Sequence, residues 1–344
     1  MSKVYVGMSG GVDSALAAAL LVEQGHDVLG VYMRNWSQDL PGFKCPWADD
    51  LADAERVAVT LGIDLEVWDC EQEYRETVVD YLVDAYSRGL TPNPDVMCNQ
   101  TVKFGTFAER AFARGADLVA TGHYARAENG ALYKGRPAND QSYMLCRLTK
   151  EQVARLTLPL GGFEKKQVRA LAEEFGLPAA HKKDSMEICF IPDKDYVGWI
   201  RRRAELPGPG DFVFHGVCVG QHDGVVNWTV GQRIPGLHEG RKLYVSRIDA
   251  KANVIELALW EELFKTEVLA GDFNWLIDPP AGKIIPASVR VRHTKWEEPP
   301  CTVTAEGERV AWIRCETPVR APAPGQSAVL YQGERLIGGG FILG

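Results

Sequence analysis

The N-terminal half of the chain alternates short β-prone runs with longer helical runs, and this alternation limits the fold more than any other feature. The residue types and the glycines that end the runs predict strands over residues 3–8, 28–33, 65–68 and 117–121, and helices over residues 14–24, 50–61, 71–88, 103–114 and 165–175. Strands that alternate with helices form a parallel sheet covered on both faces. The sequence therefore predicts an α/β fold with a doubly wound parallel sheet, in which ligands bind beyond the carboxyl ends of the strands.

The pattern changes after Arg203, where prolines and glycines alternate over residues 207–210 as in a linker. Within the first part, Asn129-Gly130 predicts a hairpin turn. Short β-prone runs then occupy residues 212–219, 225–230, 287–292, 301–305, 310–315, 328–331 and 336–342. Regular short strands of this kind form a small barrel or sandwich. We predict an α/β domain over residues 1–205, a small central β-rich domain over 206–265 and a β-barrel-like domain over 266–344.

Charge and cysteine spacing limit the classes of function. The formal net charge is -8, so general affinity for nucleic acid is not expected and any RNA site must be local. Eight cysteines are widely spaced without a CxxC pair, which argues against a zinc ribbon or an iron–sulfur cluster, and no metal-ligating residues are predicted. The start of the chain is unlike a signal peptide, and no stretch approaches the ~20 apolar residues of a membrane span. We expect a cytoplasmic protein without a membrane partner.

The segment Ser9-Gly10-Gly11-Val12-Asp13-Ser14 joins the first predicted strand to the first predicted helix. This arrangement aims backbone N–H groups and the positive end of the helix dipole at one point, where an anion fits. The glycines allow a phosphate to approach closely, and the two serine hydroxyls can donate further hydrogen bonds. Asp13 would repel a bare phosphate, so it either holds a magnesium ion or fixes the loop. The alternative is a glycine-rich turn capped by serine.

Two cysteines differ from the others in their surroundings. Cys98 ends a loop with two prolines, and a following helix N-terminus could favour its thiolate. Asp95, three residues earlier, could act as an acid or a base. Cys189 follows Lys182 and Lys183, whose charges favour a thiolate, although its apolar neighbours also fit a core strand. On spacing alone, Cys98 fits a buried cap as well as a nucleophile.

Together these segments resemble the tRNA-specific 2-thiouridylases, which belong to the N-type ATP pyrophosphatases. The matching motifs, in the order of that family, are SGGVDS at 9–14, YMRNW at 32–36, TPNPDVMCN at 91–99, ATGHY at 120–124, DQSY at 140–143, KKDSMEICFIP at 182–192, PGQSA at 324–328 and GGG at 338–340. The match runs over essentially the whole chain. It implies an adenine nucleotide hydrolase-like N-terminal fold and the activity of a tRNA-uridine 2-sulfurtransferase. Such an enzyme adenylates the base oxygen at the first anticodon position and transfers a persulfide sulfur, giving 2-thiouridine, AMP and pyrophosphate.

The resemblance also implies roles for single residues. ATP, with Mg²⁺, would be held by Gly7, Met8, Ser9, Gly10, Gly11, Val12, Asp13, Ser14, Met33 and Gly122. The target base would meet Asn93, Pro94 and Asp95, and the tRNA would contact Asn139, Asp140, Gln141, Arg292 and His293. Cys98 would free the sulfur as nucleophile, Cys189 would carry the persulfide, and the two would form a transient disulfide. The expected partners are tRNAs that read Lys, Glu and Gln codons and a persulfide donor such as a cysteine desulfurase or a sulfur-relay protein.

Two other functional interpretations agree with part of these sequence features. Another pyrophosphatase-loop enzyme, such as an amidotransferase-type synthetase or a tRNA lysidine synthetase, also adenylates its substrate but needs no paired thiols. A non-catalytic sulfur carrier or RNA-binding protein could retain a vestigial nucleotide site. His123 follows Gly122 at a predicted strand end, where it could touch ATP or RNA or make a structural hydrogen bond.

Overall fold

The computed structural model describes residues 1–37, 47–183, 196–236, 240–278, 282–293 and 298–343. The chain divides into two compact units. The first unit consists of Met1–Val78, Asp95–Lys194 and Glu334–Leu336, and the second consists of Val79–Pro94, Asp195–Gly333 and Ile337–Gly344. None of the helices in the described ranges has the length and apolar character needed to cross a bilayer.

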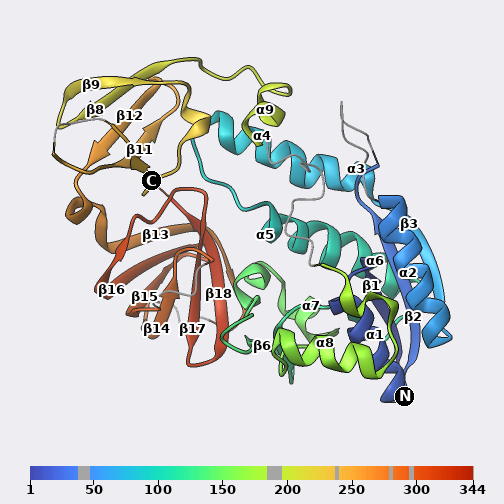
Figure 1. The fold of residues 1–344 in the computed structure, drawn as a ribbon. Helices are drawn as coiled ribbons and strands as arrows, with labels where there is room; N and C mark the ends of the chain where they lie inside the picture. The colour runs from blue at the N-terminus through green and yellow to red at the C-terminus, as the bar shows by residue number, and fades with distance from the viewer. Residues whose placement is uncertain (38–46, 184–195, 237–239, 279–281, 294–297, 344) are drawn as a thin grey trace. The chain divides into compact units, whose positions relative to one another are not determined.

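A five-stranded parallel sheet forms the centre of the first unit (Figure 1). Its strand order is β3-β2-β1-β4-β7, with β1 at Lys3–Met8, β2 at Asp27–Arg34, β3 at Asp64–Asp69, β4 at Leu118–Ala120 and β7 at Leu156–Thr157. Val4 of β1 pairs with Val28 on one side and with Leu118 on the other. The strand order therefore reverses at β1 and β4, which is the position where open α/β sheets bind their ligands.

Helices cover both faces of this sheet. Val4, Val6 and Met8 of β1 belong to a core that also includes residues of α1 (Val12–Glu23), α2 (Trp47–Leu61), α8 (Lys165–Glu174) and the 3₁₀ turn η4 (Pro178–His181). Tyr5 points to the opposite face, because strand side chains alternate. There its ring lies 6.0 Å from that of Trp68, which lies 5.8 Å from Phe107 of α6 (Phe107–Ala113). The predicted doubly wound sheet is confirmed.

Two of the predicted helices contain π-helical turns. The run predicted over 71–88 consists of α3 (Glu71–Tyr74), the π-helix η1 (Arg75–Val79) and α4 (Asp80–Ser87). A second run consists of α5 (Pro94–Cys98), the π-helix η2 (Asn99–Thr106) and α6. The predicted hairpin is present as β5 (Ala125–Glu128) and β6 (Ala131–Lys134), with φ of 51° at Asn129 and 71° at Gly130. The first unit also contains η3 (Ser142–Leu145) and α7 (Lys150–Ala154).

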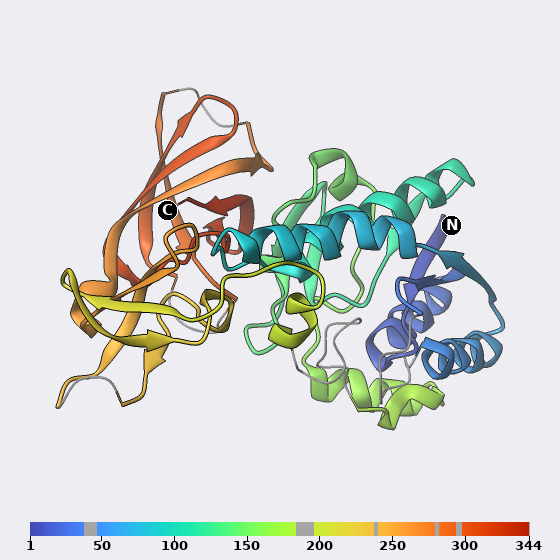
Figure 2. The same ribbon diagram turned by 90° about the horizontal axis from the view of Figure 1, so that it is seen from above.

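The second unit contains a five-stranded sheet with the order β10-β11-β12-β8-β9. The elements here are α9 (Tyr196–Arg201), β8 (Gly210–Phe214), β9 (Val217–His222), η5 (Val225–Asn227), β10 (Arg233–Ile234), β11 (Leu243–Asp249) and β12 (Val254–Ala258). Figures 1 and 2 both show β8 and β9, in yellow, beside the other strands of this sheet. The single run predicted over 212–219 was wrong, because His215 and Gly216 turn the chain with φ of 47° and 80°. The run predicted over 225–230 begins as a 3₁₀ turn.

The C-terminal strands close into a barrel. They are β13 (Phe264–Trp275), β14 (Ile284–Arg290), β15 (Pro300–Glu306), β16 (Val310–Arg320), β17 (Ser327–Gln332) and β18 (Arg335–Ile342), preceded by η6 (Trp260–Leu263). The order β13-β16-β15-β14-β17-β18 is completed by pairing of β13 with β18. Alternate residues such as Val289, Val303, Ile313 and Leu330 fill the interior. Of the two predicted alternatives, barrel and sandwich, the barrel is found.

Candidate active site

The loop after β1 is held in shape by its two serines. Ser14 Oγ accepts a hydrogen bond from Ser9 N at 3.1 Å and donates to the Gly11 carbonyl at 3.1 Å. Ser9 Oγ lies 3.3 Å from Ser14 Oγ. Gly11 is the N-cap of α1, and no side chain among the described residues caps this end of the helix. The N–H groups of the first turn therefore remain available to an anion, which supports the predicted phosphate loop.

Glycines let two other segments approach this loop closely. A Cβ on Gly122 would lie 2.7 Å from the Asp13 carbonyl carbon and 2.8 Å from Ser14 N, so the segment after β4 touches the loop backbone. Gly10 has φ of 72°, and a Cβ there would lie 2.2 Å from the Asp50 carbonyl oxygen of α2. The structure thus brings together residues 9–14 and Gly122 of the predicted ATP set.

The other predicted ATP residues contribute in different ways. A Cβ on Gly7 would lie 3.0 Å from Met33 Cε, so the Met33 side chain lies against β1. Met8 and Val12 are each 2% exposed and belong to the core of the first unit. Their side chains face the protein interior, so only their backbone groups can face a nucleotide.

Asp13 is clamped by two side chains from distant parts of the chain. Lys165 Nζ lies 2.8 Å from each carboxylate oxygen of Asp13, and the Tyr124 hydroxyl donates to Asp13 Oδ1 at 2.6 Å. Both members of the ion pair are partly buried, with 21% of the Lys165 side chain and 33% of the Asp13 side chain exposed. Of the two roles left open for Asp13, this geometry favours fixing the loop. Sequence reasoning did not identify Lys165 or Tyr124 as site residues, although Tyr124 lies in the ATGHY motif.

Asp13 is the residue of this loop that was predicted either to hold magnesium or to fix the loop. Both Asp13 oxygens are already bound, and the described residues include no group of three or more His, Cys, Asp or Glu side chains arranged to hold a metal. We expect magnesium to arrive with the phosphates of ATP.

A second lysine anchors the segment after η4 beside the loop. Lys182 Nζ lies 2.7 Å from Asp50 Oδ1 and 2.5 Å from Asp53 Oδ2, and Asp53 also pairs with Arg56. Burial would lower the pKa of Lys182, but its hydrogen bonds to the two carboxylates raise that pKa above the ordinary value. Burial would likewise raise the pKa of Asp53, but Lys182 and Arg56 hold it below the ordinary value. The Asp50 backbone also lies against Gly10, so Asp50 connects Lys182 with the loop of residues 9–14.

The loop with the first candidate thiol passes from an irregular segment into a helix. Asn93 is buried, and α5 then begins at Pro94. Asp95 is exposed in the first turn of α5, whereas Cys98 at its end is 8% exposed. Cys189 lies outside the described residues, so the predicted pairing of the two thiols stays a prediction.

A π-helix follows directly after Cys98. Asn99 is 2% exposed, and its Nδ2 donates to the Met144 carbonyl at 3.3 Å. Its Oδ1 is buried without a hydrogen-bond partner among the described residues. The next residue, Gln100, accepts a hydrogen bond from Arg147 Nε at 3.1 Å. Short π-helical segments are frequent at functional sites, which fits a reactive position for Cys98.

Three residues predicted to contact tRNA make hydrogen bonds within the first unit, and two of them, Asn139 and Gln141, contact the residues that clamp Asp13. Asp140 accepts hydrogen bonds from Gly135 N, Ser142 N and Ser142 Oγ at 2.9 to 3.0 Å. Gln141 Oε1 accepts from Tyr124 N at 2.9 Å, and Asn139 Oδ1 accepts from the backbone of Lys165 at 3.4 Å. These contacts lie within the first unit, and a role of the three residues in tRNA binding stays a prediction.

The other predicted tRNA contacts lie in the second unit. Arg292 Nη2 donates to the carbonyls of Ala321 at 2.6 Å and of Arg320 at 3.3 Å, so its guanidinium supports the end of β16. The His293 side chain is exposed. The structure therefore presents His293, more than Arg292, to solvent at this position.

His123 makes a structural contact next to Gly122. Its Nδ1 lies 2.7 Å from Thr121 Oγ1, and its ring lies 5.9 Å from that of Phe104. Burial, with a smaller contribution from Lys103, lowers the pKa of His123 well below the ordinary value. The imidazole is therefore neutral near pH 7, which favours the structural role.

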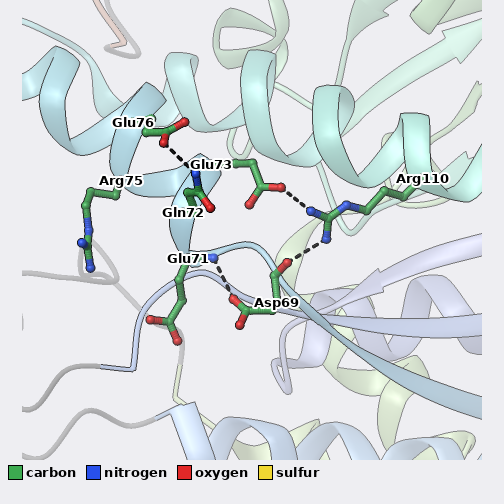
Figure 3. A pocket seen from close by; sticks show the side chains of 7 residues that line it. All are labelled: Asp69, Glu71, Gln72, Glu73, Arg75, Glu76 and Arg110. Atoms are coloured by element: carbon green, nitrogen blue, oxygen red, sulfur yellow. Dashed lines mark hydrogen bonds and ion pairs between the residues drawn. The ribbon is translucent and has the colours of Figure 1, made fainter.

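A separate pocket lies at the carboxyl end of β3 (Figure 3). It is lined by Asp69, Glu71, Gln72, Glu73, Arg75, Glu76 and Arg110. Arg110 donates to the Asp69 carbonyl at 2.7 Å and pairs with Glu73, while Gln72 donates to Glu76 at 2.9 Å. Arg34 also pairs with Asp69 and Glu71, so three guanidinium groups face four carboxylates, and this balance does not suit a triphosphate.

Known proteins resemble this chain over nearly its whole length. Residues 2–193 match the family described as the tRNA methyl transferase HUP domain, residues 203–258 match its PRC-barrel domain, and residues 265–342 match the aminomethyltransferase beta-barrel domain. The tRNA-specific 2-thiouridylase MnmA of Geobacter metallireducens is 42% identical over 99% of this chain and 96% of that protein. The protein of the same name from Akkermansia muciniphila is also 42% identical, over 99% of each chain.

The chain belongs to the tRNA-specific 2-thiouridylase family. The family name and the description of the matched HUP domain differ, since the latter mentions methyl transfer, but the full-length relatives bear the thiouridylase name. Among solved structures, NMN synthetase from Francisella tularensis has a TM-score of 0.35 at 19% identity, over 54% of this chain and 66% of that chain. That similarity is too low to support an argument about this thiouridylase-family chain.

Proposed function

We propose that this chain thiolates the wobble uridine of tRNA in an ATP-dependent reaction that yields 2-thiouridine, AMP and pyrophosphate. The observation that carries the proposal is the uncapped N-terminus of α1, closed against Gly122 and built from Ser9 to Ser14. Family membership supplies the class of substrate. A cytoplasmic location and the three domain ranges 1–205, 206–265 and 266–344 are part of the proposal.

The phosphate loop prepares ATP for attack by the base. The first-turn N–H groups of α1 bind the phosphates, and the serine hydroxyls add donors, so negative charge is stabilised as pyrophosphate leaves. The Asp13–Lys165 pair keeps the loop in shape while limiting the repulsion that a free carboxylate would exert. Mg²⁺ bound to ATP would neutralise the remaining charge.

Activation is necessary because the C2 oxygen of uridine is a poor leaving group. When O2 attacks the α-phosphorus of ATP, pyrophosphate departs and O2 becomes part of an AMP leaving group. A persulfide sulfur on Cys189 then forms the new bond to C2, either directly or as hydrosulfide freed by Cys98. In both routes the C2–O2 bond breaks, AMP leaves and a Cys98–Cys189 disulfide forms, which an external thiol reductant reopens.

The loop before Cys98 is proposed to receive the target base. Asn93 and Pro94 would contact the base, and Asp95, exposed in the first turn of α5, would act as the acid or base. A base must leave its anticodon stack to reach such a site. The proposed partners are tRNAs that read Lys, Glu and Gln codons and a persulfide donor such as a cysteine desulfurase or a sulfur-relay protein.

The decisive experiment is incubation of the chain with ATP, Mg²⁺, unmodified tRNA and a persulfide donor, followed by nucleoside analysis. The native chain should yield 2-thiouridine, while Cys98→Ser and Cys189→Ser should give none and still bind ATP. Full activity of either variant would exclude the two-thiol route and favour another pyrophosphatase-loop reaction. Absence of pyrophosphate release with tRNA present would favour a non-catalytic carrier.

A further inference from the structure

The PGQSA motif at 324–328 forms a turn that is hydrogen-bonded to the segment leading to Cys98. Gln326 Nε2 donates to the Thr91 carbonyl at 2.9 Å and to the Pro92 carbonyl at 3.3 Å. In return, Thr91 N donates to the Pro324 carbonyl at 2.8 Å. The two segments are 235 positions apart at the Gln326–Thr91 contact, and both belong to the second unit.

Close backbone contact in this turn requires glycine. Gly325 has φ of 91°, and a Cβ there would lie 3.0 Å from Thr91 N and 3.1 Å from the Thr91 carbonyl oxygen. Two backbone hydrogen bonds hold this turn against strand β18 of the barrel. Gly325 N donates to the Ile342 carbonyl at 3.0 Å, and Ile342 N donates to the Gln326 carbonyl at 2.8 Å. Gln326 therefore projects from a well-supported backbone.

Two prolines limit the backbone donors of the segment that Gln326 contacts. Pro92 and Pro94 have no N–H group, so residues 91–94 have only the two backbone donors of Thr91 and Asn93. Pro92 is buried and Thr91 is half-buried, so their carbonyls need donors that water does not fully supply. One side-chain amide supplies both, immediately before Asn93 and helix α5.

We propose that Gln326 is a positioning residue for the thiolation reaction, since its amide sets the path of the loop that presents Asn93, Asp95 and Cys98 to the target base. This inference rests on the proposed function. It assigns to the C-terminal barrel a part in shaping the catalytic loop, in addition to any contact with tRNA. Gln326 itself touches no reacting atom.

The test compares Gln326→Ala with Gln332→Ala in the full chain. Gln332 is a matched control, because its Nε2 also donates to a proline carbonyl of the second unit, that of Pro286, at 3.1 Å. We expect Gln326→Ala to lower kcat for tRNA thiolation about tenfold, the size expected when about one net hydrogen bond is lost. Its ATP affinity should match that of the control, and its melting temperature should be somewhat lower, because two part-buried carbonyls lose their donor. Gln326→Glu, which keeps the shape but loses the donor, should lower kcat at least as much, and Gln326→Lys, which keeps a donor, should recover part of it.

A second measurement reads the loop without tRNA. The rate at which a small thiol reagent modifies Cys98, followed by mass spectrometry, should change several-fold in Gln326→Ala and stay at the native value in Gln332→Ala. Native kcat in Gln326→Ala or Gln326→Glu overturns the inference, as does a loss of kcat that Gln326→Lys does not partly reverse. If the native chain produces no 2-thiouridine, the proposed function fails, and the Cys98 modification rates still test the positioning role.

Discussion

Replacing Lys165 by methionine removes the cation that neutralises Asp13 beside the phosphate loop. Exposed ion pairs contribute about 0.2–1 kcal/mol, and breaking a buried pair costs about 3–5 kcal/mol. The side chains of Lys165 and Asp13 are 21% and 33% exposed, so their pair lies between these limits. We therefore expect Lys165→Met to lower the free energy of unfolding by about 1–2 kcal/mol. Because the uncompensated carboxylate also repels the phosphates, the dissociation constant for ATP should rise about 5- to 30-fold.

The assay is ATP titration by calorimetry together with urea unfolding of each variant. Lys165→Arg keeps the charge and should bind ATP more tightly than Lys165→Met, and Lys166→Met, at the exposed neighbouring position, should bind ATP as the native chain does. Removing the carboxylate as well, in Asp13→Asn with Lys165→Met, should restore part of the affinity. The reasoning fails if Lys165→Met binds ATP with native affinity, or if the double variant binds no better than Lys165→Met.

Three further predictions follow from single contacts. Gly122→Ala should abolish measurable ATP binding, because its Cβ would lie 2.7 Å from the Asp13 carbonyl carbon; tight binding by this variant would contradict the close approach. In the native fold, exposed Cys218 should react with iodoacetamide far faster than Cys301, because burial raises the pKa of Cys301 to about 12 and leaves roughly one thiolate in 10,000 at pH 8; equal rates by mass spectrometry would refute this. Because burial lowers the pKa of His123 in the folded state, the free energy of unfolding should fall as the pH falls below about 6.5, the pKa of a free histidine. His123→Gln should therefore lose less unfolding free energy than the native chain between about pH 7 and pH 5. An equal loss in both would count against burial of His123 as the cause.

Local patterns predicted most elements of the first unit because each element carries its own signal. Lys3–Met8 is a strand as predicted, and Asn129-Gly130 forms its hairpin with both residues at positive φ. The turn at residues 9–14 was also recognisable, since glycine and serine between a strand and a helix determine its local geometry, and its binding of phosphate stays a prediction.

Contacts between distant segments carried no such signal. Nothing local to Lys165 indicates that its ammonium reaches Asp13, 152 positions away, and nothing local to Gln326 indicates Thr91. The hairpin turn at His215 was missed for a different reason, because histidine seldom adopts positive φ and the flanking residues look like one strand. The PGQSA motif was visible in the sequence, but its role depends on the folded barrel.

The π-helix η2 gives the helix after Cys98 a place where a change of one residue in chain length can be absorbed. A π turn closes i to i+5, so it holds one residue more than an α-helical turn closed i to i+4. Deleting a single residue from Asn99–Thr106 would remove this extra residue, so α5 and α6 could continue as one α-helix with little change of phase between them. The same deletion within α6, which is α-helical throughout, would rotate all preceding residues of the helix, Cys98 included, by about 100° relative to the residues after it.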